Sequence, residues 1–81
     1  MFVVARTSAN RIGEVKAYLY GGQSIVSEPV NSLYGTFVIV ESAHGLAGKM
    51  LVDRLGSGMI GAKEFETRAE AEAYIESETA D

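Results

Sequence analysis

The residues of this chain that could carry catalytic chemistry are one histidine and a few carboxylates. His44 is the only histidine, and Glu41 and Ser42 stand just before it, which brings together the residue types of a hydrolytic triad. Residues adjacent along a strand or turn point to different sides, however, and a triad needs members from separate elements. Glu64 and Glu66 on one strand face would be about 7 Å apart, a paired-carboxylate spacing that exposed edge-strand acids explain equally well. We therefore expect no catalytic residue and no enzyme.

A glycine-rich stretch that begins at Gly56 and ends at Gly61 matches the GxGxxG pattern of dinucleotide-binding loops. That chemistry needs a helix N-terminus after the glycines to hold a pyrophosphate, whereas residues 62–66 have the character of a strand. The stretch therefore predicts a hairpin turn, with a nucleotide or small-ligand site as the alternative. Because the chain has no cysteine and a single histidine, we expect no cofactor and no metal ion.

Acidic residues are concentrated at the C-terminal end. The net charge is −4, and residues 64–81 hold seven of the eleven acids but one of the seven bases. An acidic field repels phosphates and attracts basic proteins. We therefore expect no direct binding of nucleic acid and favour a basic protein, or a nucleic-acid-binding protein complex, as the partner. The alternative is that the acidic residues only keep a small domain soluble.

Strand and turn signals fill much of the chain. A proline cannot donate to a central ladder, so the strand that contains Pro29 is expected at a sheet edge. The run Thr-Phe-Val-Ile-Val-Glu is the most apolar in the chain, which favours a central strand. The predicted strands are residues 1–7, 24–30, 36–41 and 59–66, with a turn at residues 31–35.

Two segments, residues 8–20 and 44–55, fit a helix and a strand equally well. Two architectures therefore stay open: an antiparallel meander closed by a C-terminal helix, or a split βαββαβ arrangement with the same helix appended. Both belong to the α+β class, with a single antiparallel sheet in one small domain, residues 1–81. The lack of cysteine and of any apolar run near about 18 residues predicts a soluble, cytoplasmic protein without membrane contact.

A helix over residues 67–77 is the most secure element. Thr67 and Glu70 form a Thr-x-x-Glu capping box. An apolar stripe for docking on the sheet follows, made of Ala71, Tyr74 and Ile75. Opposite it lie Glu72 and Glu76, like charges at i,i+4 with no lysine to pair them, and Glu76 and Glu78 stand at the C-terminal end, where the helix dipole disfavours anions. A local rule broken without visible compensation marks a place to look for function, with the alternative that exposed, salt-screened charges cost little.

Residues 60–67, running into the helix from Arg68 to Ile75, resemble the strand-into-helix ending of some small phage-encoded anti-CRISPR proteins. The resemblance covers about sixteen residues. It implies a non-enzymatic inhibitor that docks on a CRISPR effector complex, often on a surface meant for nucleic acid. The family shares no common motif, so the resemblance assigns no functional residue.

The leading hypothesis is an interaction module whose acidic helix face engages a basic partner, most concretely an inhibitor of a nucleic-acid-handling complex. Tyrosines near turns are candidate anchors because they bury a large area at low entropic cost, with a partly buried core position as the alternative. A third hypothesis is a structural subunit that self-associates, as a homodimer, through an edge strand or these turns. The predicted partner-binding residues are Glu66, Glu70, Glu72, Glu76, Glu78, Tyr20 and Tyr34.

Overall fold

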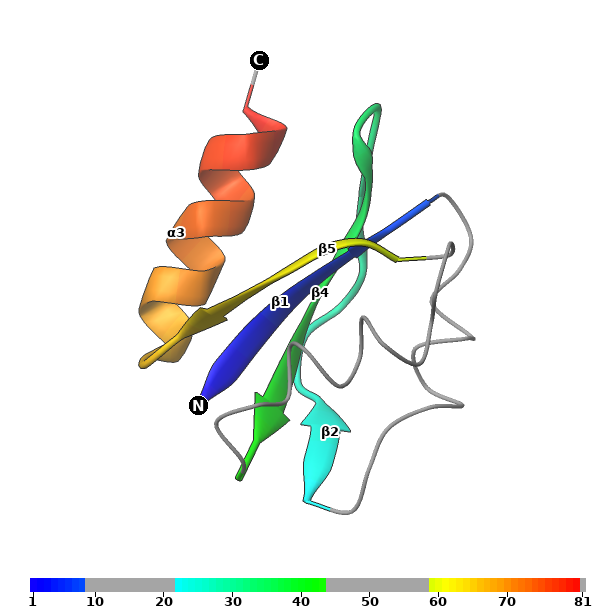
Figure 1. Cartoon of the computed structure of the whole chain (residues 1–81). Helices are drawn as coiled ribbons and strands as arrows, with labels where there is room; N and C mark the ends of the chain where they lie inside the picture. The colour runs from blue at the N-terminus through cyan, green and yellow to red at the C-terminus, as the bar shows by residue number, and fades with distance from the viewer. Residues whose placement is uncertain (9–21, 44–58, 81) are drawn as a thin grey trace.

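The computed structural model describes residues 1–8, 22–43 and 59–80. In this part of the chain an antiparallel sheet packs against a C-terminal helix (Figure 1), which confirms the predicted α+β class. The elements are β1 (Phe2–Thr7), β2 (Gln23–Ile25), β3 (Val30–Ser32), β4 (Gly35–Ser42), β5 (Met59–Phe65) and α3 (Arg68–Thr79).

The strand order is β2-β4-β1-β5, and β3 also pairs with β4, next to β2 on the same side. Strand β4 therefore lies inside the sheet, which confirms the central position predicted for the most apolar run. Because β1 and β2 both pair antiparallel with β4, they run parallel to each other with β4 between them. A meander keeps consecutive strands adjacent, so this order follows the split alternative instead. The ambiguous segments 8–20 and 44–55 fall almost wholly outside the described residues.

The edge strand predicted at residues 24–30 is divided in two. Strands β2 and β3 both pair with β4 along one edge, as expected for a segment with Pro29, but residues between them leave the regular ladder. Val26 N–H still donates to Ile39 O at 2.9 Å, and Ile39 N–H donates to the Ser27 hydroxyl at 2.8 Å. A side chain thus replaces the backbone acceptor where the edge strand breaks.

The turn predicted at residues 31–35 is shorter in the structure. Strand β3 continues to Ser32 and β4 begins at Gly35, which leaves Leu33 and Tyr34 as the turn. Gly35 has a φ of 114°, a region that glycine enters at little cost because it has no Cβ. The result is a tight hairpin that projects from the sheet edge (Figure 1).

The core on the helix side of the sheet joins α3 to the two inner strands. Val4 and Ile39 are each 1% exposed and lie on the same sheet face, because they are register partners between β1 and β4. Ala71 and Ile75 of the predicted stripe pack against them, with Tyr74 partly buried beside. Burying each large apolar side chain contributes about 1.5–3 kcal/mol. The opposite sheet face is buried as well, at Val3, Ala5, Val38 and Val40.

Helix α3 begins where the capping signal predicted. Thr67 is the N-cap, and its hydroxyl accepts a hydrogen bond from Glu70 N–H at 3.2 Å. The helix continues to Thr79, two residues beyond the predicted end, and Ala80 N–H caps it by donating to Glu76 O at 2.9 Å. The described residues contain no helix long and apolar enough to span a membrane.

Candidate protein-binding site

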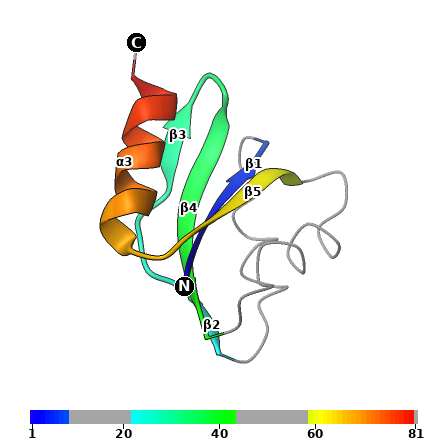
Figure 2. The same cartoon turned by 60° about the vertical axis from the view of Figure 1, so that its left-hand side comes forward.

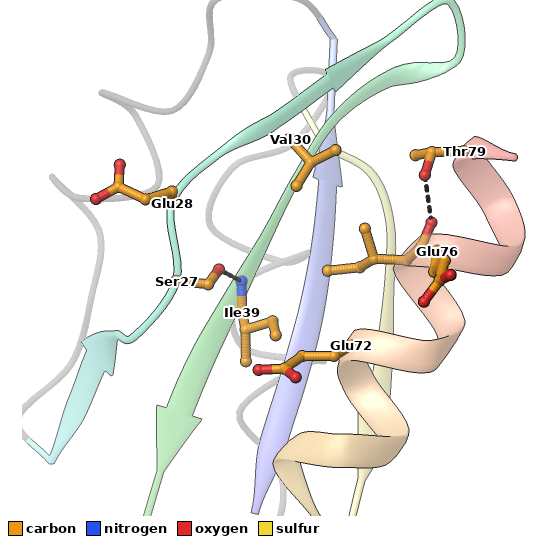
Figure 3. A pocket seen from close by; sticks show the side chains of 8 residues that line it. Ser27, Glu28, Val30, Ile39, Glu72, Glu76 and Thr79 are labelled. Atoms are coloured by element: carbon orange, nitrogen blue, oxygen red, sulfur yellow. Dashed lines mark hydrogen bonds between the residues drawn. The ribbon is translucent and has the colours of Figure 1, made fainter.

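An open groove runs between α3 and the edge of the sheet where β2 gives way to β3 (Figure 3). Its volume is about 310 Å³, at the lower end of the roughly 300–1,000 Å³ of ligand pockets. The lining residues come from the β2–β3 connection, β3, β4 and the groove-facing side of α3: Ser27, Glu28, Val30, Ile39, Glu72, Ile75, Glu76 and Thr79.

The floor of the groove is apolar. Ile39 of β4 and Ile75 of α3 form its base and are themselves 1% and 6% exposed. Val30 of β3 closes the sheet side and is 37% exposed, a large value for an aliphatic side chain in a strand. Because Ile39 and Ile75 are already buried, Val30 provides most of the apolar surface that a partner could cover, with a gain of about 25 cal/mol per Å².

Carboxylates border this floor. Glu72 and Glu76 lie one helical turn apart on the groove side of α3, and Figure 3 shows the Glu72 side chain reaching over the groove toward the sheet. Glu28 lies on the opposite rim, in the β2–β3 connection, and its carboxylate points away from the helix. The last turn of α3 contains no basic residue. The groove therefore combines an apolar floor with a negative border.

Arg68 corrects one expectation from the sequence. Glu72 does have a cationic partner, because Arg68 Nε donates to its Oε1 at 2.9 Å across one helical turn. Both side chains are at least half exposed, so the pair contributes only about 0.3–0.5 kcal/mol. Arg68 Nη2 also donates to Val26 O at 2.6 Å and ties the start of α3 to the sheet edge. Glu76 has no cationic partner among the described residues.

The structure divides the acidic face that the sequence predicted. Glu70 lies roughly 160° around the helix axis from Glu72, and its carboxylate accepts a hydrogen bond from Thr67. Glu66 follows the end of β5 instead of sharing the strand with Glu64. Of the predicted glutamates, the structure brings only Glu72 and Glu76 together in the groove.

Glu78 lies on the other flank of α3, beside Tyr74. Burial raises the pKa of the Tyr74 hydroxyl, and the hydrogen bond to Glu78 and its negative charge raise this pKa further, while Arg6 acts in the opposite direction. Lys63 Nζ lies 4.9 Å from the centre of the Tyr74 ring, which packs against Phe65 at 5.3 Å. This cluster joins α3 to β5, so Glu78 lies beside residues that hold the helix on the sheet.

The hairpin tip is the other exposed feature near the groove. Leu33 is 96% exposed and Tyr34 61% exposed. The Ser32 hydroxyl braces the turn, because it accepts from Tyr34 N–H at 3.1 Å and donates to Gly35 O at 3.0 Å. The tip and the C-terminal end of α3 lie at the same end of the molecule in both views (Figure 2). Tyr34 therefore lies on the surface, where the predicted anchor role requires it.

Some contributors to this site escaped the sequence analysis. Glu28, Val30 and Leu33 were not predicted as binding residues. Only Leu33 had a signal in the sequence, as an apolar residue beside a tyrosine in a turn. Tyr20, His44 and Gly56 lie outside the described residues. Gly61 lies in β5 opposite Arg6, within the strand predicted at residues 59–66 and not in the turn predicted for the glycine-rich stretch. Among the described residues, no group of three acids or histidines could hold a metal ion.

Comparisons with models of protein families, with curated protein sequences and with solved structures gave no match. The groove, the charge around it and the hairpin tip are therefore the features of the protein that bear on its function.

Proposed function

We propose that this protein is a non-enzymatic interaction module that docks the groove side of α3 and the hairpin tip on a basic surface of a partner protein. The groove supplies the observation that carries the proposal. Its apolar floor lies beside Glu72 and Glu76, and braced apolar residues project from the hairpin at the same end of the molecule. An apolar centre with a charged rim is the usual composition of a protein interface.

The charge selects the class of partner. A polyanion would be repelled by the carboxylates along α3, so nucleic acid is a poor ligand for this surface. A second copy of the chain would set the same glutamates against each other across a twofold axis. A basic protein surface removes both difficulties and adds electrostatic steering to its association rate.

The concrete form of the proposal is an inhibitor of a nucleic-acid-handling complex in the cytoplasm. The surfaces on which such complexes bind phosphates are basic, and the paired carboxylates of Glu72 and Glu76 would compete with phosphates for them. The resemblance of residues 60–75 to small anti-CRISPR proteins adds support, since it implies inhibition by occupying such a surface.

Affinity capture from lysates of the source cell and its host, at low and at moderate salt, tests this function. The tagged protein is expected to retain a basic nucleic-acid-binding complex at low salt and to lose much of it at moderate salt, because salt screens exposed charges. The captured complex is then assayed for binding of its own nucleic acid, which added protein should displace. Capture without such displacement would contradict the inhibitory form.

A matched pair of double variants locates the surface. Glu72→Gln with Glu76→Gln removes the two groove carboxylates and should slow association with the captured complex about tenfold. Glu64→Gln with Glu66→Gln removes equal charge at β5 and beyond its end, and should keep the association rate near the wild-type value. Equal losses in both double variants would show that only net charge matters and would argue against the groove.

A further inference from the structure

The groove combines two properties that together restrict what fits it. An aliphatic or aromatic side chain would rest on the floor at Ile39 and Ile75 and cover the exposed part of Val30, but an uncharged apolar segment would gain nothing from the carboxylates. A purely cationic segment would pair with Glu72 and Glu76 but would leave the exposed part of Val30 in water. An occupant that satisfies both must carry the two kinds of group side by side.

From this we infer that the groove receives a partner segment in which one apolar side chain is flanked by lysine or arginine. The inference rests on the proposed function and specifies the chemistry of the segment that enters. The apolar side chain covers the floor, while the flanking cations pair with Glu72 and Glu76 on the helix rim. Lysine and arginine suit this border because their long aliphatic stems cover apolar surface while the charged head stays in water.

The charges along the groove side of α3 favour a cation above the helix rim. Within the described part of the chain, Glu76 has no cationic partner and Glu72 pairs with Arg68 alone. The C-terminal end of a helix carries a partial negative charge, and α3 has no basic residue in its last turn to offset it. The field along this rim therefore favours an incoming positive charge.

The groove is formed before any partner arrives. The Ser27 hydroxyl accepts from Ile39 N–H and fixes the sheet rim, and Arg68 links α3 to Val26 on the same rim. Ile75 is held in the core. Because these contacts exist in the free protein, binding does not require the loss of conformational entropy that assembling the site would cost.

Titration of the isotope-labelled full chain with short blocked peptides, followed by amide NMR shifts, tests the inference. The probe is Gly-Lys-Leu-Lys-Gly, and the controls are Gly-Lys-Ala-Lys-Gly and Gly-Glu-Leu-Glu-Gly. Addition of Gly-Lys-Leu-Lys-Gly should shift the amide signals of Val30, Ile39 and Ile75. Replacing its leucine by alanine should weaken binding about tenfold because less apolar surface is covered, and replacing its lysines by glutamate should abolish binding.

A second pair of variants keeps the test independent of net charge. Val30→Lys places a cation on the groove floor, at an edge strand that tolerates lysine, and should abolish binding of the probe. Ser24→Lys adds the same charge at an exposed position of β2, outside both the groove lining and the hairpin tip, and should leave most of the affinity. Backbone shifts far from the substituted residue report whether each variant keeps the fold.

The outcomes separate this inference from the proposed function. Equal affinity for the leucine and alanine peptides, or shifts that avoid Val30 and Ile75, would overturn the groove inference while leaving acidic docking intact. Groove-specific binding of the leucine peptide supports the inference even where capture from lysates yields no inhibited complex, which would count against the inhibitor function alone.

Discussion

Ser27 has a structural role that its residue type and its place in the sequence do not indicate. Its hydroxyl accepts from Ile39 N–H at 2.8 Å, at the point where the edge strand is interrupted before Pro29. Ile39 is 1% exposed, so water cannot replace this acceptor without cost. Ser27→Ala should lower the free energy of unfolding by about 1–2 kcal/mol in a urea titration. Ser24→Ala, at an exposed position of β2, is the control, and an equal loss there would contradict this role.

Tyr74 makes the stability of the protein depend on pH in the alkaline range. Its pKa is raised from 10.0 by burial and by Glu78, so the folded state holds this proton more tightly than the unfolded chain. The resulting stabilisation is complete below about pH 10 and declines as the pH rises through the raised pKa. Urea midpoints measured between about pH 8 and 11 should fall less steeply for Tyr74→Phe than for the wild type.

The control for this pH dependence is Tyr34→Phe, which removes a hydroxyl at the exposed hairpin tip. Lysines and other tyrosines also titrate in this range, so the informative quantity is the difference in slope between variants. An unchanged slope in Tyr74→Phe would show that this hydroxyl is not the group responsible.

Helix α3 carries charge that is unfavourable for its own stability. Glu76 faces the negative end of the helix dipole and lies at i+4 from Glu72. Glu76→Lys should therefore raise the free energy of unfolding by roughly 0.5–1 kcal/mol, since it complements the dipole and pairs with Glu72. The same change should weaken binding of the lysine–leucine peptide about tenfold, because it reverses charge at the groove.

Glu66→Lys makes the same charge change outside the helix and serves as the control for both measurements. It should alter neither stability nor peptide affinity by a comparable amount. A variant Glu76→Lys that gained stability and kept full affinity would show that the helix charge is merely tolerated.

The β3–β4 hairpin exposes apolar side chains that contribute little to folding. Leu33 is 96% exposed, so Leu33→Ser should change stability by less than about 0.5 kcal/mol. If the tip is an anchor, the same change should speed dissociation from a captured partner severalfold and leave the salt dependence of association unchanged. Surface plasmon resonance at two salt concentrations measures both. Unchanged dissociation would remove the tip from the interface.

Protection of backbone amides from hydrogen exchange should follow the position of each strand in the sheet. Strands β1 and β4 have a paired neighbour on each side and carry the buried residues of both faces, whereas β2 and β3 are short and form an edge. Amide hydrogen exchange should therefore be slowest at Val4 and Val38, close to the global unfolding limit, and faster in β2 and β3. Slowest exchange in β3 would contradict this order.

The sequence predicted part of the candidate site. Glu72, Glu76 and Tyr34 were identified from charge and residue type alone. It could not show that Glu70 and Glu78 leave the shared face, because a helix spreads its residues around an axis whose orientation only docking fixes. Nor could it place Glu28 and Val30 opposite α3, since about forty residues of chain separate them from the helix.

The sequence by itself determined the elements whose causes are local. The Thr67 cap, the Ala71–Ile75 stripe, the run at residues 36–41 and the edge position of Pro29 depend on interactions within a few residues, or on a missing N–H. The tertiary structure alone decided the strand order, the division of the edge strand at Ser27 and the groove. These depend on contacts between distant segments, whose free energy is set by the packed core and not by any short stretch of chain.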